Sequence, residues 1–290
     1  MKVGIGQFSF HRYFGEVTRW EQAPDIRWTV NDFMQRAASH GVKTVGVQTS
    51  YLTQAEAECL PEIAAAHGLE VILEWGHPVG LYMGLSPQAV YDLRGWMGRA
   101  HRWCYPLLRI VAGHPTLRGQ EPVETQIRRL APILRRISAE ARDLGITIAL
   151  ENHGDFTPLE LQTLIGETGS GNLRALLDFG NTVRLGADLI TSIRSLASLI
   201  VAVHLRDLQV LPESIGDPLA FWPTVPLGCG ALEIDGALQE LYRTGFQGCL
   251  LLELTNLHEK WATQEDEIIH QSLTWLRKWR RANSSLPAVG

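Results

Sequence analysis

Four side chains of the types that bind divalent metal ions each follow a short apolar run. Glu151 follows IAL, Asp178 follows ALL, His204 follows VAV and Glu253 follows LLL. A charged group left unpaired beside a protein core costs several kcal/mol, so each of these groups needs a partner. Three carboxylates gathered at one place repel one another unless a cation lies between them. One imidazole with carboxylate oxygens suits Mn²⁺, Co²⁺, Zn²⁺ or Mg²⁺, and we therefore predict a site for one divalent metal ion.

The alternation of side chains along a strand predicts that these four groups face one interior. Residues two positions apart in a strand lie on the same face. Two positions before Glu151, His204 and Glu253 stand Ala149, Ala202 and Leu251, respectively. Small and medium apolar side chains of this kind suit the layers that fill the inside of a barrel.

The chain alternates short apolar runs with amphipathic stretches, as strands and helices alternate in a parallel α/β protein. The predicted strands span residues 2–9, 44–50, 70–76, 107–113, 146–152, 173–180, 199–206 and 248–255. The predicted helices lie near residues 29–40, 53–67, 86–104, 122–144, 157–168, 187–198, 233–244 and 263–282. Such a series of strand–helix units fits either a closed (β/α)₈ barrel or a doubly wound sheet.

The first strand decides between these two architectures. A doubly wound nucleotide-binding fold carries GxGxxG after its first strand. Here Gly4 and Gly6 lie within the strand, no third glycine stands at the start of a helix, and the pattern GxxxxGK[ST] is absent from the sequence. We predict a single (β/α)₈ TIM barrel. Because no Pro/Gly/Ser-rich break divides the chain, we expect one domain over residues 1–290. The active site of such a barrel lies at the C-terminal ends of its strands, where the four polar groups occur.

Several sequence strings carry a resemblance to a known family. They are ALEN (149–152), LLDFGN (176–181), VHLRD (203–207), LLLEL (250–254) and the glycine-rich GCGALEID (228–235). Taken together and in this order, they resemble the sugar phosphate isomerase/epimerase superfamily, the xylose isomerase-like TIM barrels. The similarity is clearest in the C-terminal half, whereas the N-terminal half matches mainly in its alternation of strands and helices.

The resemblance implies that Glu151, Asp178, His204 and Glu253 bind one divalent metal ion. The ion would hold a carbonyl and an adjacent hydroxyl of a sugar, so that removal of the proton next to the carbonyl gives an enediolate. Glu151 and Glu253 are then the candidates for general base and general acid, as in related epimerases. Arg206 shares a face with His204, and it would either hold a substrate oxygen or phosphate or form an ion pair with a site carboxylate.

A second group of polar residues is predicted at the same rim. Its members are His11, Gln48, Glu74, His77, His114, Asn152, His153 and Asn181. Among them we expect His11, Glu74, His77, His114 and Asn181 to contact substrate. His77 and His114 each occur as Gly-His-Pro directly after a predicted strand, where an imidazole serves as ligand, proton shuttle or substrate contact.

Two loop features bear on the substrate. Residues 208–232 form the longest irregular stretch, with Phe221 and Trp222 expected to be exposed, and such long loops act as lids, as binding loops or as stiff connectors. The turn Gly228-Cys229-Gly230 would either offer N–H groups to a phosphate or serve as a tight turn. Phosphorylation of the substrate therefore stays open.

Three other functions remain open at this stage. A dehydratase of the inosose or dehydroshikimate type begins with the same proton abstraction and then expels hydroxide. The superfamily also includes endonuclease IV, but Asn181 stands where that nuclease has a further histidine ligand. The arginines near 128–136 and 277–281 lie on predicted outer helices, away from the barrel mouth. The third alternative is a sugar-binding barrel without catalytic activity.

Composition limits the partners. The 26 basic and 31 acidic side chains give a formal net charge of −5, which offers no general attraction to nucleic acid or to an anionic membrane. No apolar run approaches the ~20 residues that span a bilayer, and the four cysteines form no CxxC pair. We expect a cytoplasmic protein with free thiols that acts on a small sugar or sugar phosphate. A homo-oligomer is also open, since Trp261, Trp275 and Trp279 would cover either the barrel or a second copy.

Overall fold

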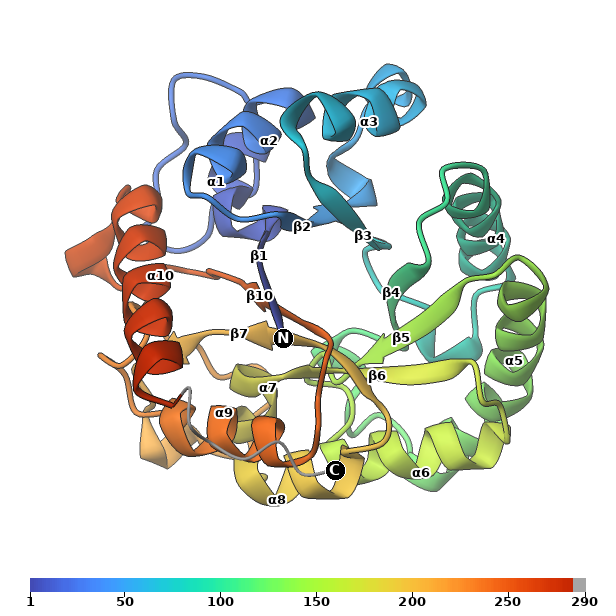
Figure 1. Ribbon diagram of the computed structural model, residues 1–290. Coiled ribbons are helices and arrows are strands. Elements are labelled where there is room, and N and C mark those ends of the chain that lie inside the picture. The colour runs from blue at the N-terminus through green and yellow to red at the C-terminus, as the bar shows by residue number, and fades with distance from the viewer. Residues whose placement is uncertain (284–290) are drawn as a thin grey trace.

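The computed structural model describes residues 1–283, and this part of the chain folds into a closed barrel surrounded by helices (Figure 1). Eight parallel strands of the described residues close in the order β1-β10-β7-β6-β5-β4-β3-β2. The predicted (β/α)₈ TIM barrel is therefore confirmed. Residues 284–290, which the single-domain prediction also covers, lie outside the described residues.

Each barrel strand lies inside one of the predicted ranges, and each is shorter than its range. The barrel strands are β1 (Lys2–Gly6), β2 (Thr44–Gln48), β3 (Glu70–Glu74), β4 (Leu107–Val111), β5 (Thr147–Glu151), β6 (Leu173–Asp178), β7 (Ile200–Leu205) and β10 (Cys249–Leu252). Glu151 and Asp178 are the last residues of β5 and β6, and Glu253 directly follows β10. The predicted strand-end positions are thus confirmed.

The outer helices follow the predicted order, and polar side chains cap several of their N-termini. They are α2 (Val30–Ser39), α3 (Gln54–His67), α4 (Pro87–Arg102), α5 (Val123–Asp143), α6 (Pro158–Thr168), α8 (Leu189–Leu196), α9 (Ile234–Arg243) and α10 (Glu265–Ala282). The hydroxyls of Thr29, Thr53 and Thr157 each accept a hydrogen bond from the third backbone N–H of their helix, which a free helix end leaves unsatisfied.

The apolar core forms two layers. The larger one lies between the barrel and the helices, and α10 contributes Trp279 to it while Trp261 and Trp275 pack against its edge. Two smaller clusters consist of side chains that alternate with the outward-facing ones along their strands, as expected inside a barrel. One holds Ala149, Leu176 and Ala202, and the other holds Ile72, Cys249 and Leu251. These clusters form the floor beneath the polar strand ends.

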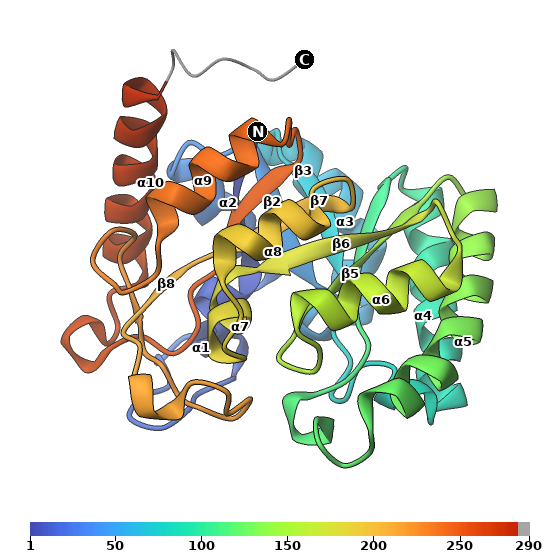
Figure 2. The ribbon, with the colours of Figure 1, turned by 90° about the horizontal axis from the view of Figure 1, so that it is seen from below.

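Short elements cover the end of the barrel opposite the N-terminus, where Figure 2 shows α1 (His11–Phe14) and α7 (Phe179–Arg184). The 208–232 stretch is more ordered than predicted, because β8 (Asp207–Leu208) pairs with β9 (Thr224–Val225) in an antiparallel ribbon. Phe221 and Trp222, the two aromatic residues predicted to be exposed in this stretch, differ in their actual exposure. Trp222 is 1% exposed and its Nε1 donates to Ser214 Oγ at 2.7 Å, so its expected exposure was wrong. Phe221 is partly exposed.

The remaining ordered segments are single turns of 3₁₀-helix. They are η1 (Gln7–Phe10), η2 (Thr49–Tyr51), η3 (Tyr82–Gly84), η4 (Pro115–Leu117), η5 (Pro212–Ser214) and η6 (Glu259–Trp261). Among residues 1–283, none of the helices has the length and apolar character needed to cross a membrane. The four cysteines are free thiols, as predicted.

Candidate active site

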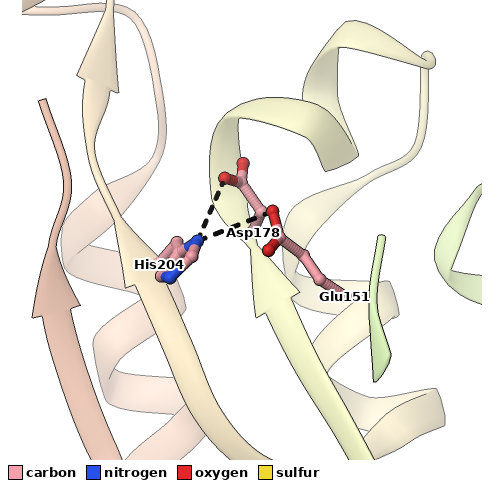
Figure 3. A group of neighbouring side chains, drawn as sticks. All are labelled: Glu151, Asp178 and His204. Atoms are coloured by element: carbon pink, nitrogen blue, oxygen red, sulfur yellow. Dashed lines mark ion pairs between the residues drawn. The ribbon is translucent and has the colours of Figure 1, made fainter. Parts of the chain in front are cut away.

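Three of the four predicted metal ligands meet at the ends of neighbouring strands. Asp178 on β6 is in register with His204 on β7, and Glu151 ends the adjoining strand β5. One ligand atom from each of these three residues lies within 4.8 Å of the others. The Nδ1 of His204 is 3.5 Å from Glu151 Oε1 and 3.9 Å from Asp178 Oδ2, as Figure 3 shows. All three side chains are buried. The structure therefore provides a group that can hold a metal ion.

The ring orientation of His204 fits metal binding. Its Nε2 lies 2.8 Å from Glu74 Oε1, and the pairing of a ring N–H with a carboxylate oxygen makes Nε2 the donor of this hydrogen bond. The other ring nitrogen, Nδ1, is turned toward Glu151, Asp178 and Glu253, where it can give up a proton and bind a metal ion. This Nδ1 is buried and has no hydrogen-bond partner among residues 1–283. A buried nitrogen without a hydrogen bond is costly, and a divalent cation between Nδ1 and the carboxylates would provide a direct bond.

The charges around His204 favour a cation at this place. Burial lowers the pKa of His204, but the carboxylates of Glu253, Glu151 and Glu74 outweigh that effect and raise the pKa well above its ordinary value. The same field that favours a proton on the imidazole favours a metal ion among the carboxylates. The donor set of one imidazole nitrogen and several carboxylate oxygens matches the divalent ions predicted from the sequence.

Glu74 lies behind His204 instead of facing the substrate, which was its predicted place. Its side chain is fully buried and its Oε2 accepts a hydrogen bond from Gln48 Nε2 at 3.1 Å. Gly46 on β2 makes room for it, since a Cβ at that position would lie 2.7 Å from the Glu74 carboxylate. Glu74 therefore fixes the orientation of His204 through a hydrogen bond, as outer-sphere carboxylates do at metal centres.

We expect Glu74→Gln to weaken divalent metal binding by about tenfold to a hundredfold, since a neutral amide makes the imidazole less basic and orients it less firmly. Competition between the protein and a chelating dye for Mn²⁺ or Zn²⁺ measures this change. Glu70→Gln is the matched control, because Glu70 begins the same strand and pairs on the surface with Lys2. Equal affinities in the two variants would contradict the role assigned to Glu74.

Glu253, the fourth predicted ligand, lies on the opposite side of His204 from Glu151. Its Oε1 is 3.4 Å from His204 Nδ1, and its Oε2 is 3.4 Å from Arg206 Nη1. Burial raises the pKa of Glu253 to about 7 against the opposing effect of His204 and Arg206. Arg206 also donates to Asp178 from Nη2 at 2.5 Å and from Nε at 3.2 Å. Of the two roles predicted for Arg206, the ion pair with a site carboxylate is therefore present.

Arg109 belongs to the site although it was not among the residues predicted from the sequence. It lies on β4, is buried, and donates from Nε to Glu151 Oε2. Burial raises the pKa of Glu151, but Arg109 and His204 together hold it well below its usual range. The available signal was an arginine in the middle of the apolar run LLRIVAG, where an isolated charge requires a partner.

A cavity of about 600 Å³ opens above these residues. The predicted residues in its wall are Gln48, His77, His114, Glu151, His153, Asn181, Arg206 and Glu253. His77 stacks on Trp75 with 5.3 Å between ring centroids, and its Nδ1 has no hydrogen-bond partner among the described residues. Burial lowers the pKa of His153 to about 4, so this ring is neutral at physiological pH and can both donate and accept hydrogen bonds. The cavity has the size and polarity of a small-molecule site.

Two other predicted residues take part in the framework around the site. His11 is not among the residues that line the cavity; its Nε2 lies 2.9 Å from Glu21 Oε2 and its Nδ1 lies 2.8 Å from the carbonyl of Phe8. Burial lowers the pKa of His11, but Glu21 outweighs this and raises it. Asn152 ties β5 to β6, since its Oδ1 accepts from the N–H of Asp178 at 2.7 Å.

The glycine-rich turn serves the fold instead of a phosphate. The carboxylate of Asp207 accepts hydrogen bonds from the backbone N–H groups of Gly228 and Gly230 at 2.9 Å and of Leu232 at 3.2 Å. A Cβ at position 230 would lie 2.1 Å from Asp207 Oδ1, so only glycine fits there. Of the two predicted alternatives for this turn, the tight turn is therefore the one present.

Comparison with known proteins gives the same architecture. Residues 34–279 match the family model described as xylose isomerase-like TIM barrel. The inosose dehydratase of Lacticaseibacillus casei is 27% identical over 136 residues, which are 43% of this chain and 46% of that protein. The chain spans less than half of the length of the curated relatives it matches.

Solved structures resemble the whole chain at lower identity. An L-ribulose 3-epimerase superposes with a TM-score of 0.75 at 19% identity, covering 99% of both chains. The IolI protein with a bound zinc atom superposes with a TM-score of 0.74 at 16% identity, covering 99% of this chain and 100% of that one. At these identities the likeness establishes the fold alone.

Proposed function

Because the chain belongs to the xylose isomerase-like TIM barrel family, we propose that it is a metal-dependent isomerase or epimerase of a sugar or sugar derivative. One observation carries this proposal. The Nδ1 of His204 is buried without a hydrogen-bond partner among residues 1–283 and is turned toward Glu151 and Asp178, beside a cavity of about 600 Å³. Glu151, Asp178 and His204 would hold the ion, with Glu253 beside them.

The bound ion would act as a Lewis acid toward a substrate carbonyl and orient the sugar. Glu151 and Glu253 come from separate strands and flank His204, so their carboxylates approach a substrate from different sides. One carboxylate removes the proton next to the carbonyl, and the C–H electron pair moves into an enediolate. In an epimerase, the other carboxylic acid returns a proton to the opposite face of the same carbon. In an isomerase, the proton goes to the former carbonyl carbon, and the proton of the adjacent hydroxyl moves to the former carbonyl oxygen.

We expect the metal-loaded protein to introduce deuterium next to the carbonyl of its substrate in D₂O, because the abstracted proton exchanges with solvent before it is returned. Incubation with a panel of ketoses, ketose phosphates and inososes, followed by NMR, measures this. Protein treated with a chelator is the control and should exchange no proton. Absence of exchange with every compound, in protein shown to contain the metal, would contradict the proposal.

A dehydratase is the second candidate, favoured by the sequence similarity to an inosose dehydratase. It shares the first proton abstraction and differs in the second step. The intermediate then expels a neighbouring hydroxyl group, which takes a proton from the second carboxylic acid and leaves as water. The same NMR experiment separates the two reactions. An isomerase or epimerase gives a labelled isomer of unchanged composition, whereas a dehydratase gives a product that has lost one molecule of water.

A further inference from the structure

The cavity wall contains an arginine that the proposed chemistry does not use. Arg184 lies in the last turn of α7, six residues after the predicted ligand Asp178, and lines the cavity together with Asn181. Its Nη1 donates to Asn181 Oδ1 at 2.8 Å, and its guanidinium lies 5.9 Å from the ring centroid of Trp222. These contacts from α7 and from the 208–232 loop hold the side chain in the wall.

Arg184 is half-buried and differs from Arg109 and Arg206, the two buried arginines of the cavity wall, in having no ion pair with any carboxylate among residues 1–283. Arg109 is paired with Glu151, and Arg206 with Asp178 and Glu253. No carboxylate of residues 1–283 forms an ion pair with Arg184, and its Nε is buried without a hydrogen-bond partner. A guanidinium carries five N–H donors, and one of them donates a hydrogen bond to a side chain in the described part of the chain.

The electrostatic balance of the site points the same way. Once a divalent ion is bound, the negative charges of the buried carboxylates balance the positive charges of the ion, Arg109 and Arg206. Arg184 remains a half-buried positive charge that forms no ion pair among the described residues. Burial and the nearby charge of Arg206 lower its pKa to about 10 despite the attraction of Asp178 and Asp217. An anion that enters the cavity would therefore stabilise the charged form of this guanidinium.

We propose that Arg184 is a specificity-determining residue that binds an anionic group of the substrate, a carboxylate or a phosphate. This inference rests on the proposed function. The planar guanidinium has free donors for a bidentate contact with such an oxyanion. Since the N–H groups of the glycine-rich turn bind Asp207, that turn does not provide the anion site.

The test compares small probes on the metal-loaded protein. Binding of glycerol 3-phosphate, glycerate and glycerol is measured by calorimetry in the native protein, in Arg184→Met and in Arg184→Lys. We expect the native protein to bind at least one anionic probe more tightly than glycerol, and Arg184→Met to lose about tenfold to a hundredfold of that affinity. The lysine variant should retain part of it. Whichever anion binds more tightly distinguishes carboxylate from phosphate.

Control measurements separate this inference from the proposed function. Arg128→Met on α5 is the matched variant, because Arg128 is exposed and contacts only its own helix. Circular dichroism checks that each variant is folded. Equal affinity of Arg184→Met and the native protein, or no preference of the native protein for either anion over glycerol, would overturn the inference. If anion binding depends on Arg184 but no compound of the panel exchanges deuterium, the anion site stands and the proposed reaction fails. If compounds of the panel exchange deuterium but Arg184→Met binds both anionic probes as tightly as the native protein, the proposed reaction stands and the anion site fails.

Discussion

His204→Gln is expected to lower the divalent metal affinity by more than about a hundredfold, beyond what the loss of an outer-sphere partner costs. The change removes the Nδ1 donor, whereas the glutamine amide can still donate to Glu74 and occupies a similar volume. It also leaves the ion pairs of Arg109 and Arg206 in place, so the buried arginines keep their partners. The metal content of the purified protein and a competitive chelator titration measure the effect.

Thermal unfolding gives a second readout for this variant. A metal ion at a hundredfold excess over its Kd stabilises the native state by about 2.7 kcal/mol if the unfolded chain does not bind it. The native protein should therefore unfold at a higher temperature when metal is added, and His204→Gln should not. His67→Gln is the matched control, because His67 ends α3 on the surface and contacts Asn31. Full metal content in His204→Gln would refute the assigned site.

The predictable part of this site is local in sequence. Each ligand follows an apolar run at the end of a strand, and the period of two along the strand fixes the direction of its side chain. The alternation of strands with helices then brings consecutive strand ends to one side of a barrel. For this reason the positions of Glu151, Asp178, His204 and Glu253 follow from the sequence, and so does the floor of small residues beneath them.

The pairing of charges depends on contacts between distant segments, which no local pattern encodes. Arg109 meets Glu151 only because β4 and β5 are adjacent and in a particular register. His11 meets Glu21 through an irregular loop that has no periodicity to interpret. Arg184 lies between a predicted strand and a predicted helix, and only the folded chain places it on α7, near Trp222 of the 208–232 loop. The same loop buries Trp222, although its proline-rich sequence predicted exposed aromatics.

Glu253→Gln should lower kcat by about 10²- to 10⁴-fold at saturating metal, which is the range for loss of a general acid or base. Glu253 lies outside the tightest group of possible ligands, which Glu151, Asp178 and His204 form. We therefore expect this variant to lose less metal affinity than His204→Gln while losing proton transfer. The amide keeps the size of the side chain, so the cavity and the contact with Arg206 change little.

Two measurements on Glu253→Gln separate catalysis from metal binding. Metal analysis at the concentration of the assay shows whether the site is filled, and the rate of deuterium exchange into the substrate reports proton abstraction. Glu259→Gln is the matched control, because Glu259 lies on the surface in η6, beyond the strand end. If metal-filled Glu253→Gln keeps a kcat within about tenfold of the native value, the decrease is smaller than the loss of a general acid or base causes. Proton transfer would then be assigned to another residue. His153 would then be the next residue to replace, since its neutral imidazole lines the same cavity.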